Sequence, residues 1–239
     1  MATTTRMTSA DEVSEPHSTA QAITRAARDA FAEKGYDGAS VAEIARRVGI
    51  VEGAVYRHFP SKRDLLHQVI RSFYEPLVES TTAGASAIEW PVDRVRYLIR
   101  RGLQALTDDR LGCRLIISEA RTFDDYYESE IADLSRRYTS LMVDAVRDGI
   151  HRGDFRPDTN PQLVRDLVYG GIEHMAWGAI TGHGDFELDL TARQLTDLVL
   201  AGITSPPPST TADPTSRLEA VADRLEAVLP STPTDPEQP

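Results

Sequence analysis

Cysteine, long apolar runs and excess positive charge are all scarce in this chain of 239 residues. The one cysteine, Cys113, excludes an internal disulfide framework and fits a reducing, cytoplasmic setting. No apolar run approaches the roughly 20 residues that a membrane-spanning helix needs, so we expect no membrane partner. The Thr-rich start lacks the basic and apolar stretches of a secretory signal. With 41% apolar and 26% charged residues, the chain has a globular composition.

Charge is distributed unevenly along the chain. In total, 26 Lys and Arg face 37 Asp and Glu, a net charge of −11, which argues against a surface coated with positive charge for nucleic acid. Residues 19–65 nevertheless carry 8 basic against 6 acidic side chains, whereas the remainder carries 18 against 31. This asymmetry indicates two units with different roles.

Helical periodicity runs through the chain, and no stretch alternates between apolar and polar residues as a strand would. The pattern therefore predicts an all-α fold. Ser40 opens a capping box, Gly49 ends the helix that follows it, and Ser61 caps a later helix. Apolar positions at helical spacing predict five longer helices, at residues 91–107, 110–122, 124–151, 161–182 and 190–203.

The most informative local pattern is a helix-turn-helix at about residues 40–59. Such a motif needs a small residue where its helices cross, a turn residue that tolerates positive φ, and an apolar anchor on the second helix. Ala45, Gly49 and Val55 supply these at offsets of four and six residues. This geometry would project the second helix of the pair toward a major groove about 12 Å wide.

The sequence through this turn closely resembles the DNA-binding domain of TetR-family transcriptional regulators. The matching positions are Phe31, Gly35, Tyr36, Ile44, Ala45, Tyr56, Phe59, Ser61 and Lys62. The resemblance implies a ligand-responsive repressor that binds a palindromic double-stranded DNA operator. It also implies a homodimer, because one short recognition helix reads too few bases to be specific alone.

Carried over position by position, the resemblance assigns eight residues to DNA. Ser40 opens the second helix, where its cap and a phosphate compete for the same N-terminus. The positions that grip backbone phosphates are Tyr56, His58 and Lys62. The positions on or beside the recognition helix, where base edges are read, are Glu52, Gly53, Ala54 and Arg57. This sequence departs from the family at Val51 and Ala54, where hydroxyl residues are common.

The same resemblance organises the rest of the chain. Its expected parts are a disordered leader at 1–18, the DNA-binding domain at 19–66, a ligand-binding and dimerisation domain at 67–204, and a Pro-rich tail with a short amphipathic helix at 205–239. Apolar positions on the last two long helices are the expected dimer faces: Leu163, Leu167, Ile172 and Met175 on one, and Leu195, Leu198, Val199 and Gly202 on the other.

A second resemblance indicates which effector the protein binds. Residues 163–177 and 200–203 resemble the C-terminal domain of the fatty-acid-degradation branch of the family, which binds long-chain acyl-coenzyme A. Candidate pocket residues are Tyr97, Cys113, Arg114, Arg121, Met142, Tyr169, His174 and Trp177. Either a basic rim for the coenzyme or surface ion pairs would account for Arg100, Arg101, Arg114 and Arg121.

Other functions stay open at this stage. Aromatic residues on an acidic domain, Tyr126, Tyr127 and Trp177, also suit a repressor of an efflux gene that responds to cationic drugs. The small positive balance of residues 19–65 also suits a helical adaptor that does not bind DNA. No metal-ligand spacing appears, and no nucleophile, base and oxyanion hole assemble. We therefore expect neither an enzyme nor a metal or other cofactor.

Overall fold

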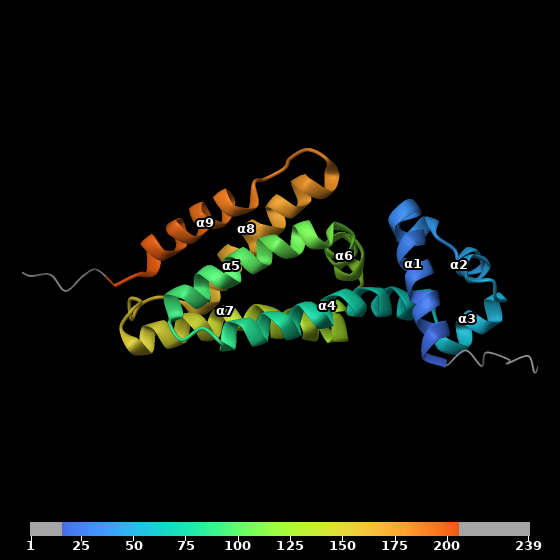
Figure 1. Ribbon diagram of the computed structural model, residues 1–239, viewed down its shortest axis with the longest axis horizontal. Coiled ribbons are helices and arrows are strands. Elements are labelled where there is room, and N and C mark those ends of the chain that lie inside the picture. The colour runs from blue at the N-terminus through green and yellow to red at the C-terminus, as the bar shows by residue number, and fades with distance from the viewer. Residues whose placement is uncertain (1–15, 206–239) are drawn as a thin grey trace, which may run out of the picture.

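The computed structural model describes residues 16–205, and every named element in that range is helical (Figure 1). The main helices are α1 (Pro16–Gly38), α2 (Val41–Val48), α3 (Glu52–His58), α4 (Lys62–Ser86), α5 (Pro91–Asp108), α6 (Arg110–Arg114), α7 (Glu130–Arg152), α8 (Pro161–Thr181) and α9 (Leu188–Ile203). The predicted all-α fold is confirmed. None of the helices in residues 16–205 is long and apolar enough to cross a membrane.

Local chemistry fixes the ends of the first helices. Ser40 accepts a hydrogen bond from the Glu43 N–H at 3.2 Å at the start of α2. Ser61 accepts one from the Asp64 N–H at 3.1 Å at the start of α4. Gly49 ends α2 with a φ of 77°, a left-handed conformation that glycine adopts without strain. These residues therefore set the first and last residues of α2 and the first residue of α4.

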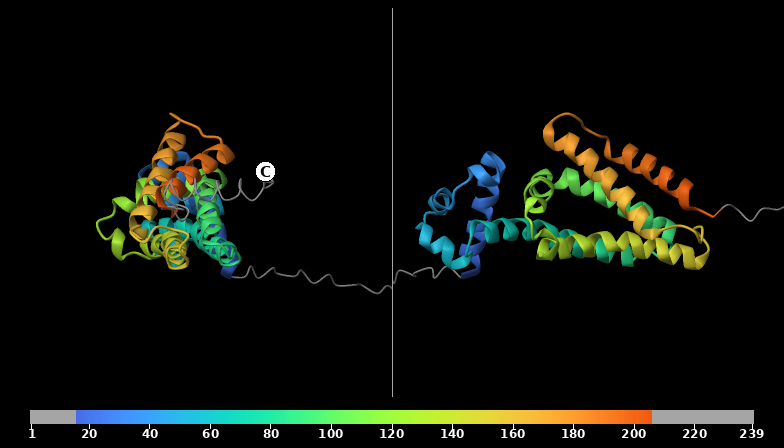
Figure 2. Two further views of the ribbon diagram at one scale, coloured as in Figure 1. Left: turned by 90° about the vertical axis from the view of Figure 1, so that its left-hand side faces the viewer. Right: turned by 180° about the vertical axis from the view of Figure 1, so that it is seen from behind.

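Two groups of helices are joined by α4. The helices α1, α2 and α3 pack together at one end of the molecule, and α4 runs from that end into the larger group (Figure 1). There α5 packs against α7 and α9, and α7 packs against α4 and α8. The helices α8 and α9 lie side by side along one flank (Figure 2). The predicted boundary between residues 66 and 67 falls inside α4, so one continuous helix links the two domains.

The prediction of one α-helix at 110–122 is wrong after Arg114. This segment divides into α6, a π-helical turn at Leu115–Glu119 and a 3₁₀ turn at Ala120–Thr122. A π-helical turn holds one more residue than an α-helical turn, and apolar spacing over a few residues does not separate the two. This irregular segment contributes Ile116, Ile117 and Arg121 to a hollow in the larger domain.

Two predicted starts also differ from the observed ones. The helix predicted at 124–151 begins at Glu130, because Ser129 caps α7 by accepting a hydrogen bond from the Ala132 N–H at 3.2 Å. At the other end of the chain, α1 begins at Pro16, inside the predicted leader, since a first-turn proline costs no helical hydrogen bond. The predicted tail helix lies outside the described residues.

Candidate DNA interface and ligand pocket

The recognition helix predicted from the sequence is α3, which stands at the outer end of the smaller domain (Figure 1). Val55 is buried on its inner face, and Ala45 of α2 is buried with it, as the motif requires. Ala54 is also buried, at 9% exposure, so it does not present a surface to DNA and we leave it out of the interface. Val51 is the N-cap residue of α3 and makes no side-chain cap hydrogen bond, because it lacks the hydroxyl that is common at this position in the family.

Most of the other predicted DNA residues lie on the surface. The exposed ones are Ser40, Glu52, Gly53, Tyr56, Arg57 and His58. Lys62 is half-buried, because its ammonium lies 4.4 Å from the centre of the Tyr36 ring and donates to the Asp37 carbonyl at 3.3 Å. The structure therefore places seven of the eight residues, all except Ala54, at least partly exposed at one end of the molecule.

Charge pairing distinguishes this end from the rest of the chain. Within residues 16–205, most arginines of the larger domain form ion pairs, whereas Arg25, Arg46, Arg57 and Lys62 of the smaller domain have no carboxylate partner. Cations that are not neutralised by the protein are available to neutralise phosphates. Four carboxylates of residues 19–65 are unpaired as well, so the position of these cations, and not a surplus of charge, would favour DNA at this end.

The sequence reasoning missed Arg46. It lies exposed in the last turn of α2, next to Arg47. Arg47 is instead bound to Glu33 and to Glu43 at 2.8 Å, and these carboxylates raise the pKa of its guanidinium. The Arg-Arg pair at the end of a helix was the available signal, but only tertiary structure shows which of the two is free.

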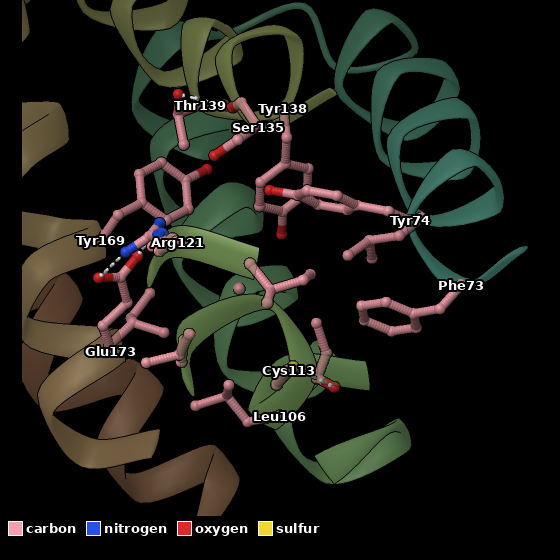
Figure 3. Close-up of a pocket in the computed structure, with 16 residues that line it drawn as sticks. Phe73, Tyr74, Leu106, Cys113, Arg121, Ser135, Tyr138, Thr139, Tyr169 and Glu173 are labelled. Carbon is pink, nitrogen blue, oxygen red and sulfur yellow. Dashed lines mark hydrogen bonds and ion pairs between the residues drawn. The ribbon is translucent and has the colours of Figure 1, made fainter. Parts of the chain in front are cut away.

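A mostly apolar hollow with a volume of about 80 Å³ lies in the larger domain (Figure 3). We call it the inner hollow. Residues of α4, α5, α6, α7 and α8 form its wall together with the irregular segment that follows α6, and they include Phe73, Tyr74, Leu106, Cys113, Tyr138 and Tyr169. A lining of apolar and aromatic side chains with a few polar groups is typical of small-molecule sites.

A second space, the outer hollow, adjoins the inner one and has a volume of about 410 Å³. The two share Arg121, Ser135, Thr139, Tyr169 and Glu173, and the outer hollow is further lined by Arg136 and Arg165. Arg121 donates to both carboxylate oxygens of Glu173 at 2.7 Å, as Figure 3 shows, and this raises the pKa of Arg121. An ion pair thus stands where an apolar space meets an arginine-lined one.

Three of the eight predicted pocket residues line the inner hollow: Cys113, Arg121 and Tyr169. Burial raises the pKa of the Cys113 thiol to about 12, so this cysteine is protonated and contributes apolar surface. In residues 16–205, no group of three or more His, Cys, Asp and Glu side chains is placed to hold a metal ion.

The other five predicted pocket residues line neither hollow. Tyr97 packs against Gly84, and Met142 is fully buried elsewhere in the core. His174 and Trp177 are exposed, on the face of α8 that points away from the domain. The structure therefore does not bring these residues to either hollow. For His174 and Trp177, the reason is that α8 is apolar on several faces, so apolar spacing alone does not show which face turns inward.

Arg114, the fifth, contacts the smaller domain instead. It donates to the Phe31 carbonyl at 3.1 Å and lies 3.4 Å from the Ala32 carbonyl, both in α1. The predicted basic rim does not form either. Arg100 pairs with Asp189 at 2.9 Å and Arg101 with Asp108 at 3.6 Å. The ion-pair interpretation therefore holds for both of these arginines.

The outer faces of α8 and α9 carry large apolar side chains in the open. Leu163, Leu167 and Trp177 are exposed on α8, and Leu190 and Leu198 on α9. Of the predicted dimer faces, Ile172 is buried toward the inner hollow, and three positions pack partly against the core: Met175, Leu195 and Val199. The exposed stripes are therefore narrower than predicted, and exposed polar positions such as His174 on α8 and Gln194 on α9 interrupt them.

Two family models match the chain. Residues 23–69 match the bacterial regulatory proteins of the tetR family, and residues 89–203 match the tetracyclin repressor-like C-terminal domain. Among named relatives, the HTH-type transcriptional repressor KstR2 of Mycobacterium tuberculosis is 29% identical over 185 residues, covering 73% of this chain and 87% of its own. The fatty acid metabolism regulator protein of Bacillus subtilis is 22% identical over 185 residues, covering 76% and 93%.

Solved structures agree in fold. The transcriptional regulator FadR of Bacillus subtilis in complex with stearoyl-CoA superposes with a TM-score of 0.68 at 20% identity, over 77% of this chain and 98% of that one. The ketosteroid transcriptional regulator KstR2 of Mycobacterium tuberculosis gives 0.60 at 25% identity, over 78% and 95%. With both domains matched in order along the chain, this protein belongs to the TetR family of ligand-responsive, DNA-binding transcriptional regulators.

Proposed function

We propose that this protein is a homodimeric repressor whose α3 helices bind a palindromic operator and whose effector is a long-chain acyl-coenzyme A. The observation that supports this choice of effector is that the inner and outer hollows meet at the Arg121–Glu173 pair. The apolar lining of the inner hollow suits an acyl chain, which would widen the hollow as it enters. The three ion-paired arginines of the outer hollow would exchange their carboxylate partners for the phosphates of the coenzyme. The complex of FadR with stearoyl-CoA supports this assignment by analogy of fold.

The outer hollow replaces the basic rim that the sequence suggested. Arg121, Arg136 and Arg165 pair there with Glu173, Asp133 and Asp166 respectively. A polyanionic head group would therefore bind by displacing these carboxylates, since each phosphate offers a guanidinium more than one charged acceptor oxygen. The acyl chain adds about 0.8 kcal/mol for each CH₂ that it buries, which is about fourfold in affinity.

A cationic drug is a weaker candidate. Its expected aromatic cage would need Tyr126, Tyr127 and Trp177 to converge, yet Trp177 points outward from α8 and Tyr127 is 79% exposed. Inside the inner hollow the only carboxylate, Glu173, is already neutralised by Arg121. A buried cation would therefore lack a counter-charge.

The effector is tested by thermal shift and operator gel shift with coenzyme A thioesters of increasing chain length, alongside coenzyme A alone and the lipophilic cation tetraphenylphosphonium. We expect stabilisation that grows with chain length and a loss of operator affinity of about 5- to 150-fold, the usual range of coupling between two sites. Stabilisation that is independent of chain length, or release by the cation alone, would contradict the proposed effector.

The DNA interface predicts a split between two substitutions. Lys62→Ala should weaken binding to operator and random duplex alike and lower the salt slope by about one, since one phosphate contact is lost. Arg57→Ala should cost about 1–3 kcal/mol on the operator and little on random DNA, since a base contact is lost. Filter binding over a salt series measures both effects.

A matched control exists for this pair. Lys34 belongs to the same domain, but its ammonium is held by Glu43 at 2.6 Å, so Lys34→Ala should leave the salt slope unchanged. Equal losses for Lys62→Ala and Arg57→Ala on every duplex would show that the assignment of phosphate and base contacts is wrong.

A further inference from the structure

One aromatic side chain of the larger domain reaches the DNA-binding end of the molecule. Phe123 lies between the two 3₁₀ turns at Ala120–Thr122 and Tyr126–Glu128, and it is half-buried. The guanidinium of Arg63 lies 4.6 Å from the centre of its ring, and the ring of His67 lies 6.3 Å from it at an angle of 73°. The ring of Phe123 is therefore held by two side chains that are one turn apart near the start of α4.

The same ring contacts the end of α1. The rings of Phe123 and Tyr36 are nearly perpendicular, with their centroids 6.0 Å apart. Tyr36 directly follows Gly35, whose φ of 73° interrupts the helix, so the regular backbone of α1 does not by itself fix the direction of the Tyr36 side chain. Packing must fix it instead. Phe31 contributes to this packing from within α1, at 5.6 Å between ring centroids, and Phe123 contributes from the larger domain.

Tyr36 in turn holds the lysine that we assign to a DNA phosphate. The ammonium of Lys62 lies 4.4 Å from the centre of the Tyr36 ring and donates to the Asp37 carbonyl at 3.3 Å. An ammonium has three protons to donate, so these contacts leave it able to donate to a phosphate oxygen as well. A lysine that is already held loses less rotamer freedom on binding than one that moves freely in solvent.

We propose that Phe123 is a positioning residue for DNA binding: by fixing the ring of Tyr36, it holds the ammonium of Lys62 in place for a backbone phosphate. This inference rests on the proposed contact between Lys62 and DNA, and it extends the requirements for DNA binding into the larger domain. Phe123 acts only through Tyr36 and Lys62. Because a phosphate carries no sequence information, the effect applies equally to operator and random duplex.

A double-mutant cycle between Phe123 and Lys62 tests this role, with filter binding of the full chain to both duplexes at one salt concentration. Phe123→Ala should weaken binding to both by about two- to tenfold, the range expected when a side chain must be immobilised on binding. In the Lys62→Ala background the same substitution should cost nothing, since the lysine that it positions has been removed. In the Arg57→Ala background it should keep its full effect.

Two further variants separate positioning from a general loss of stability. Phe123→Tyr keeps the aromatic ring and should bind both duplexes as wild type does. Phe186→Ala removes another half-buried phenylalanine of the larger domain, from the loop between α8 and α9, and should leave DNA binding unchanged. Melting curves from circular dichroism show that each variant is folded under the conditions of the binding measurement.

Several outcomes would overturn the inference. They are wild-type affinity for Phe123→Ala, an equal loss for Phe123→Tyr, and a comparable loss for Phe186→Ala. If Lys62→Ala weakened binding but Phe123→Ala had its full effect in that background, only the positioning role would be contradicted, because its effect would not pass through the lysine. If Lys62→Ala left DNA binding unchanged, the proposed phosphate contact would be wrong, and the positioning role with it.

Discussion

Replacing Leu167 and Leu198 together by aspartate should convert the protein to a monomer and lower its operator affinity by about a thousandfold, toward its affinity for random DNA. The side chain of Leu167 is 66% exposed on α8, and that of Leu198 is 74% exposed on α9. Sedimentation velocity measures the first effect and an operator gel shift the second. A seven-residue recognition helix explains the size of the loss, because a single half-site carries too few base contacts to be specific.

The arrangement of α8 and α9 explains why these positions matter. Both helices lie on one flank, and each bears a row of exposed apolar side chains. Several large exposed apolar side chains on one flank indicate an interaction site. Two copies related by a two-fold axis would bury both rows as a four-helix bundle. Two aspartates per protomer would place four unpaired charges at the centre of that bundle.

Trp90→Glu is the control for this prediction. Trp90 is also a large exposed apolar residue, at 56%, but it precedes α5 rather than lying on α8 or α9. The guanidinium of Arg152 lies 5.8 Å from the centre of its ring and would accommodate a carboxylate. This variant should remain dimeric and bind the operator. A dimeric aspartate double variant with full operator affinity would place the interface elsewhere.

How much of this molecule the sequence predicts depends on whether a feature is local. The helix-turn-helix is local: Ser40, Gly49 and Ser61 act on atoms within a few residues of themselves, and the structure has the helix ends where these residues predict them. No residue near the end of α6 predicts in this way that the α-helix stops there. The end of this α-helix depends on a π-helical turn whose apolar spacing resembles that of an α-helix.

The ligand pocket is harder to predict because it is made by packing. Tyr169 and Trp177 lie two turns apart on α8, yet one is buried in the pocket wall and the other faces outward. Tyr74 and Tyr138 went unpredicted, since nothing in the sequence shows that α4 and α7 meet α8 at the same level. Only contacts between helices distant in sequence reveal that the rings of Tyr74, Tyr138 and Tyr169 pack in a row.

Arg114 was placed in the pocket by sequence, and its actual contacts suggest a different role. Its neighbour Cys113 lines the inner hollow, whereas Arg114 itself donates to the Phe31 carbonyl of α1. That carbonyl lies one turn before Gly35, whose φ of 73° and ψ of 172° interrupt the helix and leave nearby carbonyls in need of donors. The short helix α6 therefore touches the ligand site on one side and the DNA-binding domain on the other.

A second contact joins the same two elements. Asp109 caps α6 by accepting a hydrogen bond from the Gly112 N–H at 2.8 Å, and its carboxylate also pairs with Arg28 of α1 at 2.9 Å. A ligand that displaces α6 must therefore move α1 or break these bonds. Since α1 packs against α2 and α4, such a movement would change the position of α3 in each protomer. Two recognition helices about 34 Å apart would then no longer match one turn of DNA.

Arg114→Ala should therefore uncouple the two domains. We expect the variant to bind operator and acyl-coenzyme A with near wild-type affinity, while the effect of the ligand on operator affinity falls from about 5- to 150-fold to about twofold or less. Gel shifts with and without the thioester give this ratio, and a thermal shift confirms that the ligand is still bound. Arg110→Ala is the control, because Arg110 lies in the same helix but pairs with Asp185 at 3.2 Å, away from α1. If Arg114→Ala released its operator as fully as Arg110→Ala, the signal would have to cross to the DNA-binding domain through α4 or through the contact between Phe123 and Tyr36.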